Sequence, residues 1–161
     1  MSIDTQAYRQ IIGQFATGVT VVTTAVDGWL HGMTANALTS VSLDPLLLLV
    51  CVDKAAHAHE QIAKAGRFAV NILSAGQQEV SQLFAVSAEA ERDSLRGVEY
   101  RLSANGNPII DGALAYVECA VTDRCEGGDH TIFLASVLDG EALSDGPPLL
   151  FYQGKYRALE S

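Results

Sequence analysis

Apolar residues recur at helical spacing near the start of the chain. Four of them fall at positions i, i+3, i+4 and i+7, and these are Tyr8, Ile11, Ile12 and Phe15. Asp4 or Thr5 is of a residue type that caps a helix N-terminus, and Gly18 stands where such a helix would end. The pattern therefore predicts an amphipathic helix that begins near Asp4 and ends before Gly18.

Segments rich in β-branched or continuous apolar residues follow, separated by turn residues. Asp27-Gly28 is a typical hairpin turn, so the segments on either side of it are expected to pair. About six longer strands are predicted. They cover Val19–Val26, Trp29–Met33, Leu46–Val52, Arg67–Leu73, Ala115–Arg124 and Thr131–Glu141. The shorter pieces Leu149–Tyr152 and Tyr156–Arg157 finish the chain, with Gly154 between them as a turn.

The segment Thr34–Asp44 is small and polar, and it runs through Asp44-Pro45 into the apolar run Leu46–Val52. We predict a loop followed by a central strand that is buried on both faces. A loop of this kind places backbone N–H groups and the hydroxyls of Thr34, Thr39 and Ser40 at the end of a rigid element. The junction therefore predicts a pocket for a flat polar ligand.

Helices are expected to be few and short. Ala55–Ala65 is rich in alanine, with Gly66 as its C-terminal stop, and Gly76 to Leu95 has room for one or two short helices. With so many strands, the fold class expected is mainly β with short helices, an antiparallel barrel rather than a doubly wound sheet. The chain of 161 residues is expected to form a single domain over residues 1–161.

Charge and cysteine usage narrow the class of partners. The net charge of −9 and the lack of a basic run argue against nucleic acid and against an anionic membrane surface. The first ten residues have neither the charged nor the apolar region of a signal peptide. Three cysteines without a CxxC spacing fit reduced thiols, so we expect a cytoplasmic protein. The apolar content of 48% is compatible with self-association.

Motifs for several common chemistries are missing from the sequence. No GxGxxG follows a predicted strand, and neither GxxxxGK[ST] nor GxSxG occurs. His57 and His59 would diverge on a helix, so they are expected on the surface and no metal site is predicted. Cys51 lies in an apolar run, where a thiolate is disfavoured.

Gly127-Gly128-Asp129-His130 is the second informative stretch. One interpretation is a hairpin loop in which the glycines provide positive φ and His130 is solvated. The other is a histidine held at a barrel rim, where it hydrogen-bonds a substrate amide. The residues alone leave both interpretations open.

Five stretches in order together resemble the short-chain flavin reductases, the reductase components of two-component flavin-dependent monooxygenases. The similarity extends from about Tyr8 to Arg157. The matching stretches are Phe15–Thr23, Gly32–Ser42, Phe68–Leu73, Gly128–Ile132 and Pro148–Arg157.

The resemblance implies an FMN-binding split β-barrel, antiparallel and Greek-key-like, that works as a homodimer with FMN or FAD near the subunit interface. The loop before the apolar strand would contact the flavin, and an amide with hydroxyls suits the polar ring atoms. The expected contacts there are Met33, Thr34, Ala35, Asn36, Thr39 and Ser40.

Further contacts are implied beyond the loop. Cys51, Val52 and Asp53 would offer backbone groups to the ring edge, and the Phe84-Ala85 pair would flank the flavin. Lys54, at the head of the next predicted helix, would bind the flavin phosphate. Ala55 and Ala56 stand where relatives often have Ser or Thr, so His57 and His59 are also expected near the phosphate. His130 would orient the nicotinamide of NADH or NADPH.

The function implied is the NAD(P)H-dependent reduction of free or loosely bound flavin, with reduced flavin diffusing to a separate oxygenase. The flavin accepts hydride itself, which agrees with the lack of an acid–base pair in the sequence. Two alternatives stay open. One is an oxidoreductase of the same fold that retains FMN and reduces ferric chelates, quinones or nitro compounds, and the other is a noncatalytic FMN-binding module.

Overall fold

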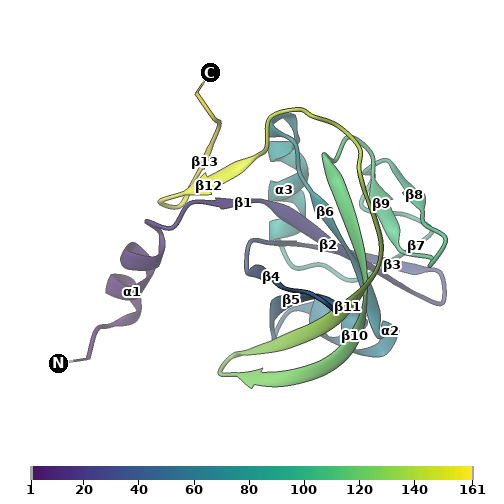
Figure 1. Cartoon of the computed structure of the whole chain (residues 1–161), viewed down its shortest axis with the longest axis horizontal. Helices are drawn as coiled ribbons and strands as arrows, with labels where there is room; N and C mark the ends of the chain where they lie inside the picture. Colours follow the sequence, from purple (N-terminus) through teal and green to yellow (C-terminus); the bar gives the residue numbers. More distant parts are fainter. Residues whose placement is uncertain (1, 161) are drawn as a thin grey trace.

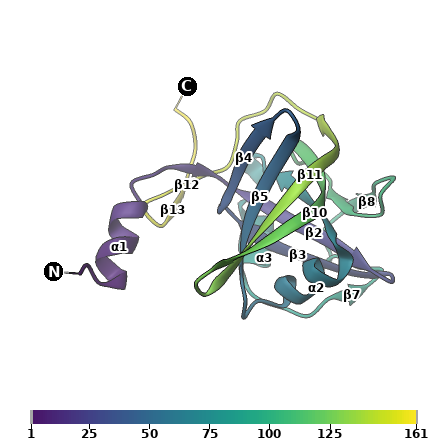
Figure 2. The ribbon, with the colours of Figure 1, turned by 60° about the horizontal axis from the view of Figure 1, so that its bottom comes forward.

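An antiparallel sheet of eight strands organises the chain in the computed structural model, which describes residues 2–160. Figures 1 and 2 show the sheet curving around its interior, with α2 against one side and α3 against another. In spatial order the strands are β4 (Leu38–Leu43), β5 (Leu46–Asp53), β11 (His130–Ala142), β10 (Ala115–Gly127), β6 (Arg67–Ile72), β2 (Thr20–Val26), β3 (Trp29–Ala35) and β7 (Glu91–Arg92).

Short strands and helices complete the chain. A three-stranded sheet joins the two ends, and a two-stranded sheet lies in the connection before β10. The first contains β1 (Thr17–Gly18), β12 (Leu150–Tyr152) and β13 (Lys155–Arg157), and the second β8 (Tyr100–Leu102) and β9 (Pro108–Ile110). The helices are α1 (Thr5–Ile12), α2 (His57–Ala65), the 3₁₀ turn η1 (Ala75–Gln77) and α3 (Gln78–Ala85).

Two clusters of apolar side chains form the core. The first lies inside the curved sheet, where Val50 and Val52 of β5 and Phe133 of β11 pack with Ile62 of α2. The second lies between the sheet and α3 and includes Leu30, Leu73, Phe84 and Leu95. Buried and partly exposed residues alternate along β5, because successive side chains of a strand point to opposite faces. Only one face of β5 therefore packs in the core.

The prediction for the first helix is only partly correct. Asp4 caps α1, since its carboxylate accepts the N–H of Ala7, but the helix ends at Ile12 and Phe15 lies outside it. The chain tightens after Ile12, because the N–H groups of Gln14 and Phe15 bond to carbonyls three residues back. The 3.6-residue pattern continues into this turn although the α-helix does not.

The prediction of a loop over Thr34–Asp44 is wrong. β3 continues to Ala35, and after a turn at Asn36-Ala37 the chain forms β4, which pairs with β5. The hydroxyl-rich residues of β4 are tolerated because the strand lies at a sheet edge, where one side faces outward. The pocket predicted for this segment therefore forms at a corner between two strands.

The apolar strand β5 is internal to the sheet, but the prediction that both of its faces are buried is also wrong. Leu48, Val50 and Val52 are buried, whereas Leu47, Leu49 and Cys51 on the other face are only partly covered. This second face is the wall of the site described below.

The N-terminal segment stands apart from the sheet. Figure 1 shows α1 beyond the small sheet of β1, β12 and β13, away from the main body. No residue of α1 is buried, and the apolar Ile11 and Phe15 are 59% and 73% exposed. None of the helices within residues 2–160 is long and apolar enough to span a membrane.

Candidate functional site

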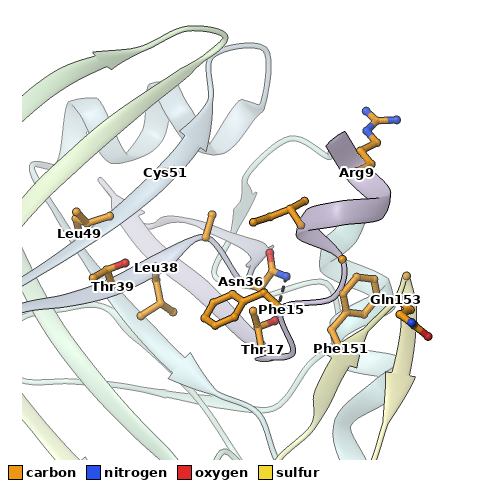
Figure 3. Close-up of a pocket in the computed structure, with 14 residues that line it drawn as sticks. Arg9, Phe15, Thr17, Asn36, Leu38, Thr39, Leu49, Cys51, Phe151 and Gln153 are labelled. Carbon is orange, nitrogen blue, oxygen red and sulfur yellow. Dashed lines mark hydrogen bonds between the residues drawn. The ribbon is translucent and has the colours of Figure 1, made fainter. Parts of the chain in front are cut away.

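A pocket of about 570 Å³ opens between the main sheet and the N-terminal arm, by which we mean α1 and the chain that follows it through β1. Figure 3 shows its walls: Phe15 and Thr17 from the arm, the corner at Asn36, the outer face of β5, and Phe151 from the C-terminal strands. Its volume lies within the range of about 300–1,000 Å³ that is usual for small-molecule sites. Segments from both ends of the chain and from its middle therefore meet at one cavity.

Asn36 lies at the turn between β3 and β4 and connects the corner to the arm. Its Nδ2 donates to Oγ1 of Thr17 at 3.1 Å, the contact dashed in Figure 3. An amide carries two N–H hydrogens and a carbonyl acceptor, so one bond to Thr17 does not exhaust its capacity. Asn36 is exposed in this chain and can offer both a donor and an acceptor to a ligand.

A smaller cavity of about 160 Å³ continues the pocket, since Asn36 and Phe151 line both. A chain of hydrogen bonds forms its wall. Thr34 Oγ1 donates to the carbonyl of Ser81 at 2.6 Å, and Ser81 Oγ lies 2.8 Å from the hydroxyl of Tyr156. These bonds connect β3, α3 and the C-terminal strand, so the cavity wall has a defined shape.

The pocket wall continues across β5 onto β11. Cys51 pairs with Ile132 and Asp53 pairs with His130, and paired residues of antiparallel strands project to the same face of a sheet. Leu49 and Cys51 line the pocket. His130 therefore shares the sheet face that forms the pocket wall.

His130 is held by its neighbour in sequence. Its Nδ1 lies 2.7 Å from Oδ1 of Asp129, and its side chain is 38% exposed. The bond from His130 lowers the pKa of Asp129, so this carboxylate stays ionised. Asp129 thereby favours a proton on Nδ1 and leaves Nε2 as the nitrogen that can meet a ligand.

The turn between β10 and β11 is tied to the end of β5. Lys54 forms an ion pair with Glu126 and also donates to the carbonyl of Gly128 at 3.0 Å. The hydrogen bond and charge of Lys54 lower the pKa of Glu126. Gly128 has φ of +72°, a conformation that favours glycine at this turn. The Lys54 side chain therefore contacts the hairpin rather than open space.

The start of α2 is only partly suited to the predicted phosphate site. Ala56 is the N-cap and provides no side-chain hydrogen bond, so N–H groups of the first turn are not used by a cap. His57 is exposed near them. His59 points to the hairpin instead, with Nε2 at 2.8 Å from Thr131 Oγ1 and its ring 5.5 Å from that of Phe133.

Three of the residues predicted to contact the flavin line neither cavity. Phe84 is 2% exposed and packs in the second core cluster, so only Ala85 of the Phe84-Ala85 pair lines a cavity. Met33 packs against the first core cluster, because alternation along β3 turns it away from the side of Thr34. Ser40 lies on β4 outside the lining of either cavity.

The remaining predicted residues divide between the pocket and its edge. Thr39 and Cys51 line the large cavity, Thr34 and Ala35 line the small one, and Asn36 lines both. Val52 points into the core with an exposed fraction of 0%, which leaves its backbone alone for the expected role. Asp53 lies at the strand end, where its carboxylate accepts the N–H of Ala55 at 2.8 Å.

Sequence reasoning missed the lining residues that come from distant segments. Phe15 and Thr17 precede the first long strand, while Phe151 and Tyr156 belong to the C-terminal strands. Both segments lie within stretches that match the family, and this match was the only signal available. Hydrophobic periodicity could not show that the two ends of the chain meet.

Comparison with known proteins points to one family along the whole chain. A family model described as "Flavin reductase like domain" matches residues 12–160. The reductase subunit HsaB of a flavin-dependent monooxygenase from Mycobacterium tuberculosis is 39% identical over 163 residues, covering 98% of this chain and 84% of that protein. An NADH-dependent flavin reductase from a Rhodococcus species is 43% identical over 157 residues, covering 94% and 85%.

Solved structures agree with these relatives. The flavin reductase PheA2 superposes with a TM-score of 0.90 at 41% identity, covering 99% of this chain and 100% of PheA2. The NADH:FAD oxidoreductase SgcE6 of Streptomyces globisporus, in complex with NAD and FAD fragments, superposes with a TM-score of 0.90 at 39% identity, covering 99% and 97%.

Proposed function

The chain belongs to the flavin reductase-like family, and we propose that it is an NADH-dependent flavin oxidoreductase. It reduces free or loosely bound flavin and supplies the reduced flavin to a separate oxygenase. Two relatives are named an NADH-dependent flavin reductase and an NADH-dependent FAD reductase, and another is named the reductase subunit of a flavin-dependent monooxygenase.

One observation in this chain carries the proposal. The wall of the 570 Å³ pocket and His130 lie on the same face of neighbouring strands, because His130 pairs with Asp53 two residues beyond Cys51. A flat ring in the pocket and a second ring near His130 can therefore lie against one continuous surface. Hydride transfer requires such close placement of two rings and the exclusion of water.

The residues of the pocket fit a flavin. Asn36 provides donors and an acceptor for the polar edge of the ring, and Leu38, Leu49 and Phe151 provide apolar surface. Thr34, Ala35 and Ala85 line the smaller continuation. Bound flavin supplies the hydride acceptor, so the protein needs to provide only binding and orientation.

His130 is proposed to bind the nicotinamide side of NADH. With Nδ1 directed to Asp129, its Nε2 is available for a hydrogen bond to the carboxamide or the ribose. This is an orienting role, in which His130 holds the donor ring and moves no proton to it.

We also propose a homodimer with the pocket at its interface. The helix α1 has eight residues and no buried side chain, and isolated helices shorter than about 12–15 residues are marginal in water. Apolar residues are exposed on β4 and β5 as well, including Leu43 at 82% and Leu46 at 51%. A second copy would cover these surfaces. Analytical ultracentrifugation of the wild type and of Phe15→Ser tests this, and a monomeric wild type would contradict it.

We further propose a cytoplasmic location for the protein. Cys51, Cys119 and Cys125 are all free thiols, as is usual in a reducing compartment. Fractionation of cells that produce the full chain tests the location.

Anaerobic mixing tests the reductase function. The protein is combined with FMN or FAD and with NADH or NADPH, and the absorbance of oxidised flavin is followed. We expect rapid bleaching with NADH, at a rate that saturates with added flavin. Bleaching no faster than without protein would refute the reductase function. A rate independent of added flavin would instead show a flavoprotein that retains its FMN.

A further inference from the structure

We propose that Lys54 and Glu126 are positioning residues, which hold the tip of the β10–β11 hairpin so that His130 meets the nicotinamide of NADH. The inference rests on the proposed function, because it assigns both side chains to the NADH side of the reductase site. It gives Lys54 a different role from the phosphate contact that the sequence predicts.

The contacts of Lys54 all lead to the hairpin turn. Its ammonium group pairs with the Glu126 carboxylate and donates to the Gly128 carbonyl at 3.0 Å. Its backbone N–H donates to the carbonyl of Asp129 at 3.0 Å. Lys54, directly after β5, thus contacts three of the four residues that precede His130.

The tip of the turn is exposed, although the pairing of His130 with Asp53 and with Gly127 fixes the backbone at its base. Figures 1 and 2 both show the hairpin tip reaching beyond the sheet, and residues 122–129 are exposed. A side chain built on Gly128 would meet nothing within 4 Å. Exposed hairpin tips open at low free-energy cost, so the contacts with Lys54 stabilise the turn whose residue Asp129 orients the His130 ring.

The charges around Lys54 also argue against a phosphate ligand. The carboxylates of Asp53, Glu126 and Asp129 all lie at this strand end and turn. The pKa values of Glu126 and Asp129 are lowered by their hydrogen-bond partners, so both groups are charged at neutral pH. A phosphate placed at Lys54 would compete with Glu126 and face like charges.

The experiment measures Michaelis constants for NADH, FMN and riboflavin in Lys54→Met and Glu126→Gln. Exposed ion pairs contribute little, so each variant should raise the KM for NADH by only about two- to fivefold with kcat nearly unchanged. The ratio of the KM values for FMN and riboflavin should stay as in the wild type. Combining Lys54→Glu with Glu126→Lys should recover part of the rise in the KM for NADH, because the swap restores the ion pair but not the hydrogen bond to the Gly128 carbonyl.

Lys64→Met provides a matched control, because it removes the Glu60–Lys64 ion pair of α2 without touching the hairpin. All constants should remain at wild-type values in this variant. Comparing Lys54→Met with Glu126→Gln also distinguishes two roles for the ion pair. In one, which we call a clamp, the pair holds the hairpin, and in the other the charge of Lys54 simply attracts the anionic NADH. Attraction alone would make Glu126→Gln lower the KM for NADH, whereas a clamp makes both substitutions raise it.

Two further results would overturn the proposal. An unchanged KM for NADH in Lys54→Met would show that Lys54 does not position His130. A selective rise in the KM for FMN over riboflavin would return Lys54 to the phosphate. A wild type that reduces no flavin with NADH would instead refute the reductase function itself, so the two failures are distinguishable.

Discussion

The ring of Phe84 on α3 lies directly against Gly32 on β3. A Cβ atom built on Gly32 would be 2.7 Å from Cε1 of Phe84 and 2.8 Å from its Cδ1, closer than real side chains approach. The ring is fully enclosed, and Arg96 lies over it at 5.8 Å from the centroid. This contact sets the distance between α3 and β3, and both elements line the smaller cavity.

We therefore expect Gly32→Ala to destabilise the protein. The added methyl group must displace the Phe84 ring from a packed core, which costs about 1–3 kcal/mol of unfolding free energy. Urea denaturation followed by circular dichroism measures the change. Gly18→Ala is the matched strand control, since nothing lies within 4 Å of its Cβ, and it should stay within about 0.5 kcal/mol. If Gly32→Ala costs less unfolding free energy in a protein that already carries Phe84→Leu, the clash with the Phe84 ring is the cause of the destabilisation.

Asn36→Leu should weaken flavin binding. The apolar side chain leaves polar atoms of the bound ring without a partner, which costs about 1–3 kcal/mol, or roughly five- to 150-fold in affinity. Fluorescence titration with FMN measures the dissociation constant. Thr17→Val removes the hydrogen bond to Asn36 but keeps the amide, and it should have a smaller effect. Equal affinities of wild type and Asn36→Leu would show that Asn36 does not contact the flavin.

His130→Ala should raise the KM for NADH more than the KM for flavin. The histidine shares the face of the pocket wall but lies on β11, across β5 from the β4 side to which Asn36 leads. One hydrogen bond of about 1 kcal/mol corresponds to roughly a fivefold change in KM. Steady-state kinetics with each substrate varied in turn decides the assignment. Asp129→Asn should also raise the KM for NADH more than the KM for flavin, but by a smaller factor, because it disturbs only the orientation of His130. A larger effect on flavin would place His130 at the flavin instead.

Buried His31 on β3 should make stability fall at mildly acidic pH. Its pKa is lowered to about 4, first by burial and then by repulsion from His57 and Arg96. Because the unfolded chain binds a proton near pH 6.5 and the folded chain does not, His31 reduces stability as pH falls from about 6.5 toward 4.

The expected loss from His31 between pH 7 and pH 5 is about 2 kcal/mol of unfolding free energy. Denaturation midpoints of the wild type and of His31→Gln across this range measure it. The variant should lose less stability on acidification than the wild type, whatever its stability at pH 7. Parallel pH profiles would mean that His31 is not buried in its neutral form.

Local pattern was enough for much of the fold and for part of the site. The β-branched segments formed strands, Asp27-Gly28 formed a hairpin turn, and Gly66 ended α2 with φ of +64°. These features depend on the preferences of neighbouring residues, which a single stretch of sequence displays. A pocket was expected near Thr34–Asp44 for the same reason, since this polar segment stands out before an apolar strand.

The tertiary structure decided which side chains reach the pocket. Thr34–Asp44 looked like a loop because its residues are small and polar, but pairing with β5 makes most of it an edge strand. Phe84 was expected beside the flavin and is buried against Gly32, and Lys54 contacts a glutamate 72 residues away. Such partners depend on how distant segments fold together. Sequence by itself therefore determined most of the strands and the family, while the long-range packing determined where the edge strand forms and which side chains reach the pocket.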